Sequence, residues 1–178
     1  MVEQVKYQIV RKAGKIEIRH YPRLVIARVG GVGDRGFNTL FQYISGNNRQ
    51  KTNLPMTAPV ISENIHMTAP VISDSRSLSF VLPGKYTLAN APVPLDERVR
   101  ILEIPDRFVA ALRFSGRWSE TIFTRKSKEL MDELAKSIFK TKGSVFVMRY
   151  SGPFTPWFLR RNEVAIEIEP AKDLAESG

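Results

Sequence analysis

The stretch Ile16–Pro22 reads IEIRHYP, and its pattern returns at Val99–Pro105 as VRILEIP. Both stretches place an apolar or aromatic residue at the first, third and sixth positions and end on a proline. This is typical of a strand that stops where a backbone donor is lost. Each copy is followed by a further strand, a turn with glycine and an amphipathic helix. The sequence therefore predicts two related halves, residues 5–83 and 98–169, joined by a turn-rich connector over residues 83–97.

Each half is expected to contain one helix. The first begins at Asp34 as its N-cap and ends at Gly46, and the second follows the N-cap Ser119 and ends at Lys140–Gly143. The second helix has an apolar stripe of Phe123, Leu130, Leu134 and Ile138. Alternation predicts strands over residues 5–11, 15–20, 24–32, 56–62, 66–73, 77–82, 98–104, 107–115, 144–150 and 163–169, with a frayed tail over 171–178. The fold class is therefore α+β, with duplicated strand–helix–strand–strand units sharing one antiparallel sheet or open barrel.

Composition and charge restrict the class of protein. The 178 residues are 43% hydrophobic and 25% charged, as expected of a single globular domain over residues 1–178, with no apolar run that would span a membrane. There is no cysteine, which excludes disulfides and thiolate metal sites, and there are two histidines, too few for a multi-histidine metal site in one chain. With no secretory leader visible, we expect a cytoplasmic protein. The net charge is +9, but the basic residues are scattered, which does not favour a nucleic-acid partner.

One short segment is doubled. MTAPVIS occupies residues 56–62 and again residues 67–73. The odd offset between the copies would turn their side chains to opposite faces of a single strand. We therefore expect two strands, or one strand and an extended loop, and the role of the second copy stays open.

Two further patterns have plain structural interpretations. GVGDRG (residues 31–36) fits a dinucleotide-binding glycine motif, but no buried parallel strand with an acidic end follows it, so a turn before a helix is expected. Glu163, Glu167 and Glu169 alternate along the last strand, and such a stripe is typical of a solvated face.

His20 ends a strand before Tyr21-Pro22, where a histidine either ligates a metal or makes an ordinary hydrogen bond.

Six segments, taken in order over residues 5–169, resemble the SOUL heme-binding protein family. They are IEIRHY (16–21), FQYISGNN (41–48), MTAPV (56–60), FVLP (80–83), RFSGRW (113–118) and PWFLRRNEV (156–164). The resemblance implies a distorted antiparallel barrel of two similar halves with two long helices. It also implies reversible, non-covalent binding of heme or another tetrapyrrole for buffering, delivery or sensing, with no catalysis expected.

A porphyrin needs a broad apolar surface and cations for its two propionates. On the first helix and the loop after it, the candidates are Phe37, Leu40, Phe41, Ile44, Arg49 and Lys51. In some family members a histidine at the position of His20 is the proposed iron ligand, so the resemblance makes His20 the candidate metal-binding residue.

Two alternatives stay open. The same fold occurs in gyrase-inhibitory-protein-like effector-binding domains. These domains hold a small amphipathic ligand in the cleft between the halves with a carboxylate on one of the last strands, and some of their relatives are hydrolases. Here Glu163, with Trp157, would be the alternative ligand-binding pair. The aromatic–basic segment Trp157, Phe158, Arg160 and Arg161 is also typical of an interaction surface, or of aromatic side chains that cap a core beside paired arginines. The oligomeric state is not predicted.

Overall fold

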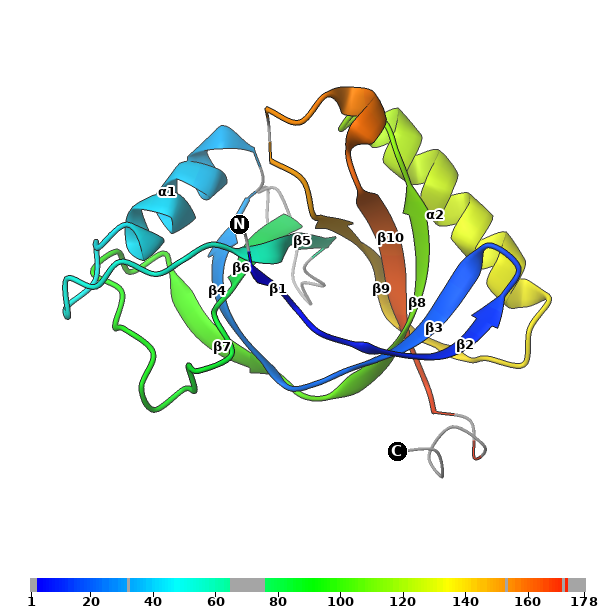
Figure 1. The fold of residues 1–178 in the computed structure, drawn as a ribbon, viewed down its shortest axis with the longest axis horizontal. Helices are drawn as coiled ribbons and strands as arrows, with labels where there is room; N and C mark the ends of the chain where they lie inside the picture. The colour runs from blue at the N-terminus through cyan, green and yellow to red at the C-terminus, as the bar shows by residue number, and fades with distance from the viewer. Residues whose placement is uncertain (1–2, 32, 65–75, 153, 171, 173–178) are drawn as a thin grey trace, which may run out of the picture. The chain divides into compact units, whose positions relative to one another are not determined.

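The computed structural model describes residues 3–31, 33–64, 76–152, 154–170 and 172. The chain divides into two compact units, each with one helix and an antiparallel sheet (Figure 1). Unit 1 contains Met1–Val5 and Arg23–Pro105, and unit 2 contains Lys6–Pro22 and Asp106–Gly178. The α+β class is confirmed, and no helix in the described part of the chain is long and apolar enough to cross a bilayer.

Unit 1 is a four-stranded antiparallel sheet with one short parallel addition. Its strands run in the order β5 (Thr57–Asn64), β6 (Arg76–Val81), β4 (Leu24–Gly30) and β7 (Arg100–Ile104), and β1 (Glu3–Gln4) pairs in parallel with β5. Helix α1 (Asp34–Ile44) packs against β4 and β6. Leu40, Tyr43 and Ile44 enter the core from the helix and meet Phe80 and Leu78 from β6, so one face of α1 is fixed by apolar burial.

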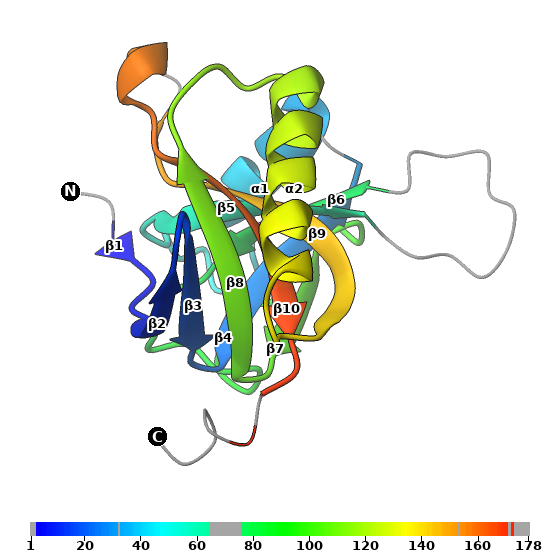
Figure 2. The same ribbon diagram turned by 90° about the vertical axis from the view of Figure 1, so that its right-hand side faces the viewer.

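Unit 2 is a five-stranded antiparallel sheet. Its strands run in the order β2 (Gln8–Ala13), β3 (Ile16–Tyr21), β8 (Arg107–Phe114), β10 (Asn162–Ile168) and β9 (Thr141–Arg149). Helix α2 (Glu120–Ala135) lies along β8 and β10 (Figure 2), and the short 3-10 helix η1 (Trp157–Leu159) stands between β9 and β10 in the chain.

The two faces of the unit 2 sheet have different chemistry. Ile16 and Ile18 of β3 and Val164 and Ile166 of β10 pack with Leu130 and other apolar residues of α2. Since side chains alternate along a strand, the residues between them point to the opposite face. That opposite face carries polar side chains and holds the charged cluster described below.

Some predicted ends of elements were wrong. The N-cap position of α1 is Gly33, at φ 94°, and Asp34 is the first helical residue. Ser119 is confirmed as the N-cap of α2, since its side chain accepts from the Ile122 amide at 3.2 Å. Helix α2 ends at Ala135, so Ile138 lies outside the apolar stripe and is exposed.

Two sequence predictions have no structural test. The strand over 66–73, His66 and the second MTAPVIS copy fall outside the described residues. Both units contain a strand, a helix and two strands in that order (β4-α1-β5-β6 and β8-α2-β9-β10). The internal duplication and the barrel nevertheless stay predictions.

Candidate functional site

Helix α1 carries two phenylalanines one helical turn apart, of which Phe37 packs against the unit 1 core and Phe41 is exposed. The rings of Phe37 and Phe41 stack with centroids 6.2 Å apart and planes 11° apart, and Phe37 also meets the Phe80 ring edge-on at 5.3 Å. Phe41 is 49% exposed, whereas Leu40 and Ile44 are buried in the core. The two rings form an apolar ledge on the helix, and Leu40 and Ile44 anchor the helix below it.

The loop after α1 is held by one buried asparagine. The Asn48 amide nitrogen donates to the carbonyls of Tyr43 at 3.0 Å and Thr52 at 2.9 Å, and its oxygen accepts from the Thr52 amide at 3.0 Å. Arg49 and Lys51 lie within this loop and are exposed. The loop therefore holds two cations beside the C-terminal end of α1.

The helix begins at the exposed Asp34, but the chain that follows is positively charged. Residues 35–62 contain no aspartate or glutamate, while Arg35, Arg49 and Lys51 are all exposed. Such a segment attracts anions rather than cations. The exposed Phe41 ring, with cations in the loop that follows the helix, suits a flat apolar ligand with carboxylates at its edge.

His20 lies in unit 2, at the end of β3. Its Nε2 atom is 3.2 Å from the Oδ2 atom of Asp106, and its ring lies 4.8 Å from the Phe108 ring. A carboxylate on one ring nitrogen is a common partner of a metal-ligating histidine, because it orients the ring and leaves the other nitrogen for the metal. The candidate residues on α1 belong to unit 1, whereas His20 belongs to unit 2.

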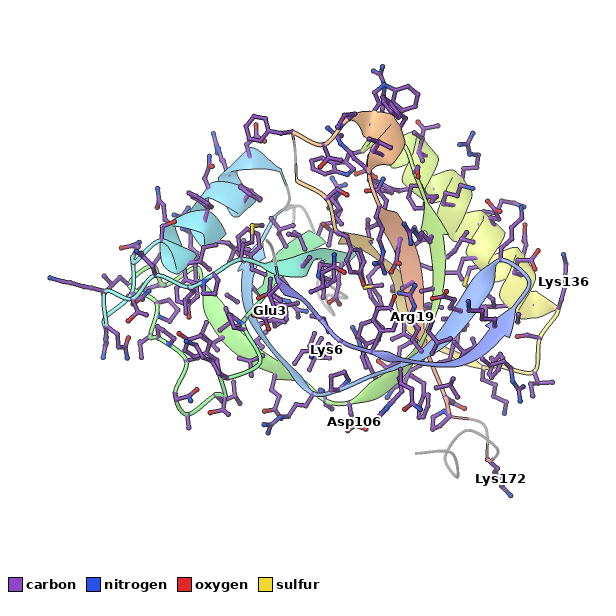
Figure 3. The ribbon with its side chains drawn as sticks, viewed as in Figure 1. Glu3, Lys6, Arg19, Asp106, Lys136 and Lys172 are labelled. Carbon is purple, nitrogen blue, oxygen red and sulfur yellow. The ribbon has the colours of Figure 1, made fainter. Side chains whose placement is uncertain are left out.

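Glu163 lies at the centre of a buried charge cluster on the polar face of unit 2. Its carboxylate accepts two hydrogen bonds from Arg19, at 2.6 and 2.9 Å, and bonds from Nε and a terminal nitrogen of Arg161 at 3.1 and 2.9 Å. Arg19, labelled in Figure 3, also bonds Glu17 and stands 4.2 Å from the Tyr7 ring centre. Two guanidiniums therefore balance the carboxylate.

The cluster holds its arginines charged and its tyrosines neutral. Burial lowers the pKa of Arg19, but the bond and attraction to Glu163 outweigh burial and raise it overall. Burial raises the pKa of Tyr150, and the negative charge of Glu163 raises it further. The Tyr150 and Tyr21 hydroxyls are 3.2 Å apart, so the phenols form a hydrogen-bonded pair beside the charges.

The prediction of a solvated glutamate stripe was wrong at Glu163, which is 0% exposed. Glu167 is partly exposed, where it meets Arg107 and Lys142, and Glu169 lies beyond the end of β10. As a site for a cationic ligand, Glu163 would first have to release Arg19 and Arg161. Trp157 lies in η1 and is half exposed. The hydrogen bonds of Glu163 named above come from Arg19 and Arg161 and do not include Trp157.

Sequence reasoning missed the partners that shape these sites. The sequence did not predict that Arg19 and Arg161 bond Glu163. One signal was present, because Glu17, Arg19 and Tyr21 alternate with Ile16 and Ile18 and therefore lie on the opposite face of β3. The sequence shows Asn48 only as part of the FQYISGNN segment, whereas the structure shows that its side chain is buried and bonded to the Tyr43 carbonyl.

Comparison with known proteins shows the family of the chain. The chain matches the SOUL heme-binding protein family over residues 2–167. It is 25% identical over 125 residues to heme-binding protein 1 of Sus scrofa, a match that covers 70% of this chain and 65% of that protein, less than two thirds of its length.

Solved structures share the fold at low sequence identity. The EcmrR C-terminal domain has a TM-score of 0.60 at 11% identity, with 93% of this chain and 99% of that chain covered. A hydrolase from Listeria innocua has a TM-score of 0.59 at 12% identity, with 87% and 92% covered. At such identities the likeness concerns the fold alone.

Proposed function

The chain belongs to the SOUL heme-binding protein family, and from this membership together with the surface of α1 we propose that it binds heme or a related tetrapyrrole reversibly. The observation that carries the proposal is the stacked pair Phe37 and Phe41, of which Phe41 is half exposed, on a helix followed by the exposed cations Arg49 and Lys51. Binding is non-covalent, because the chain has no cysteine to form a thioether with the macrocycle.

Each candidate residue has a separate role in this proposal. Phe37 and Phe41 give the apolar contact for the macrocycle, and Leu40 and Ile44 hold them in place from the core. Arg49 and Lys51 pair with the propionates through charge-assisted hydrogen bonds. When bound, heme would bring a redox-active iron. His20, oriented by Asp106 within unit 2, is a candidate iron ligand in its own right, and this role does not depend on the α1 surface.

The alternative function, a small amphipathic cation held by Glu163, receives less support. The carboxylate is enclosed and already bonded to two arginines. A cationic ligand would also be repelled by the net charge of +9 on the protein. An anionic tetrapyrrole suits both observations better.

A hemin titration followed by absorbance tests the proposal. The wild-type protein should give a saturable, one-to-one change of the Soret band that weakens but persists in high salt, because apolar contact is not screened. Changing both Arg49 and Lys51 to Glu should raise the dissociation constant about tenfold or more, since two charge-assisted contacts are lost.

The matched control changes Lys12 and Lys140 to Glu, two exposed lysines of unit 2, and so alters the net charge equally. Equal losses in the two double variants would mean that hemin responds to overall charge alone. A weak, unsaturating signal that disappears in salt would mean adsorption and would refute the proposal.

A further inference from the structure

The connection between β9 and β10 exposes a group of large apolar side chains. Phe154 is 99% exposed, and Trp157, Phe158 and Leu159 are each half exposed or more. We call residues 154–159 the aromatic tip. Single exposed apolar residues are ordinary on a protein surface, but a contiguous group marks a site of interaction.

The aromatic tip is held in a defined conformation. Backbone bonds run from the Thr155 amide to the Gly152 carbonyl at 3.1 Å and from the Leu159 amide to the Pro156 carbonyl at 2.9 Å. Nε of Arg160 donates to the Thr155 carbonyl at 2.9 Å. The apolar side chains are therefore exposed by a folded turn, and little ordering is needed when they bind.

Arginines surround the tip. Arg117 stands 5.4 Å from the Trp157 ring centre and Arg160 stands 4.3 Å from that of Trp118, around an open hollow of about 530 Å³ that Phe154 also lines. Residues 107–119 and 151–161 contain no acidic residue. Figures 1 and 2 both place η1 at the end of unit 2 where α2 begins.

We propose that the aromatic tip docks unit 2 on an anionic phospholipid surface. Tryptophan and phenylalanine favour the boundary between head groups and acyl chains, and arginines beside them reach lipid phosphates. A net charge of +9 attracts the protein to a negatively charged bilayer before the tip inserts. The family's tetrapyrrole binding is not needed for this proposal, and its test contains no hemin.

Other occupants fit less well. A second copy would bring two strongly positive proteins together, which repel each other. A stable protein interface uses about 20–30 residues a side, whereas the tip and its arginines are far fewer. A planar ligand in the hollow would compete with Arg160, and with Arg149 at 5.7 Å, both of which stack on Trp118.

Vesicle flotation tests the proposal on the full chain. Phosphatidylcholine vesicles with about 30% phosphatidylserine should bind the protein about tenfold more tightly than vesicles of phosphatidylcholine alone, and salt should weaken the binding. Changing Phe154 and Leu159 together to Ser should lower the partition coefficient onto the anionic vesicles about tenfold. Changing Ile138 and Leu88 together to Ser removes two exposed apolar side chains elsewhere, at 70% and 54% exposure, and should leave partition unchanged.

Fluorescence adds a local readout. The chain has two tryptophans, so Trp118→Phe leaves Trp157 as the single reporter, and its emission should shift to the blue when anionic vesicles are added. Failure to bind these vesicles would overturn the proposal, as would equal binding by the tip variant and its control. If sedimentation shows that the tip variant breaks an oligomer while lipid binding is absent, the tip is covered by a second copy and the lipid proposal is wrong.

Discussion

Glu163 is a carboxylate wholly enclosed in unit 2, and its charge is balanced by Arg19 and Arg161. Removing charges from water costs several kcal/mol, so such a cluster is stable only while every partner is present. Its bidentate bonds to Arg19 fix the relative positions of β3 and β10 on one face of the sheet. The residue is therefore better explained as structural than as a surface site for a cation.

Glu163→Gln should destabilise the protein strongly. It removes the negative charge between two arginines and leaves Arg19 with Glu17 as its remaining acidic partner. We expect the free energy of unfolding in urea to fall by about 3 kcal/mol. Glu167→Gln, on the same strand but partly exposed, should cost less than about 1 kcal/mol. Equal losses for the two variants would contradict the assignment.

His20→Ala tests the proposed iron ligand. If His20 ligates the iron, the hemin complex of this variant should have a displaced Soret maximum relative to wild type. Asp106→Asn should produce a smaller change, because it alters only the partner that orients the ring. An unchanged spectrum in His20→Ala would rule out His20 as the iron ligand.

Among the elements, the loop after α1 is closed mainly by the Asn48 side chain, together with backbone bonds such as that from the Arg49 amide to the Val93 carbonyl. Asn48 makes three hydrogen bonds to the backbone of Tyr43 and Thr52, and these bonds close the loop against the end of the helix. Arg49 and Lys51 are placed by this closure rather than by contacts of their own side chains with the core. The shape of the loop and the binding of an anion should therefore change together.

Asn48→Ala should separate this role from general stability. Losing three backbone hydrogen bonds at a buried position should lower the free energy of unfolding by about 2–3 kcal/mol. The hemin dissociation constant of the protein that remains folded should rise severalfold, because Arg49 and Lys51 are no longer held. The control is Asn47→Ala, an exposed neighbour in the same loop. The same stability and affinity in both variants would show that Asn48 does not shape the loop.

The helices show which element boundaries can be predicted. Ser119 was predicted as an N-cap because its hydrogen bond to the Ile122 amide is local in sequence. The end of α2 was placed too late because apolar spacing continues to Ile138. Ser137 interrupts it, since its hydroxyl donates to the Leu134 carbonyl at 2.7 Å and accepts from the Phe139 amide.

For the whole molecule, local periodicity was enough to predict an α+β chain with two helices and most of its strands. The charge cluster could not be predicted in this way, because Arg19 and Glu163 are 144 residues apart in the sequence. The strand register does not reveal the contact either, since it sets Arg19 level with Val109 and Glu167 rather than with Glu163. Glu163 was wrongly expected to be solvated for a similar reason, since alternation shows which residues share a face of the sheet but not what covers that face. The α1 candidates were easier to find, because they lie on one helix and the loop after it.

Tetrapyrrole binding at α1 is tested by comparing hemin binding by Phe41→Ser and Leu88→Ser. Both residues belong to unit 1 and are similarly exposed, at 49% and 54%, so neither change should disturb the fold. If α1 forms the tetrapyrrole surface, Phe41→Ser should raise the hemin dissociation constant about tenfold, while Leu88→Ser should match wild type. Equal affinity in the two variants would contradict the account.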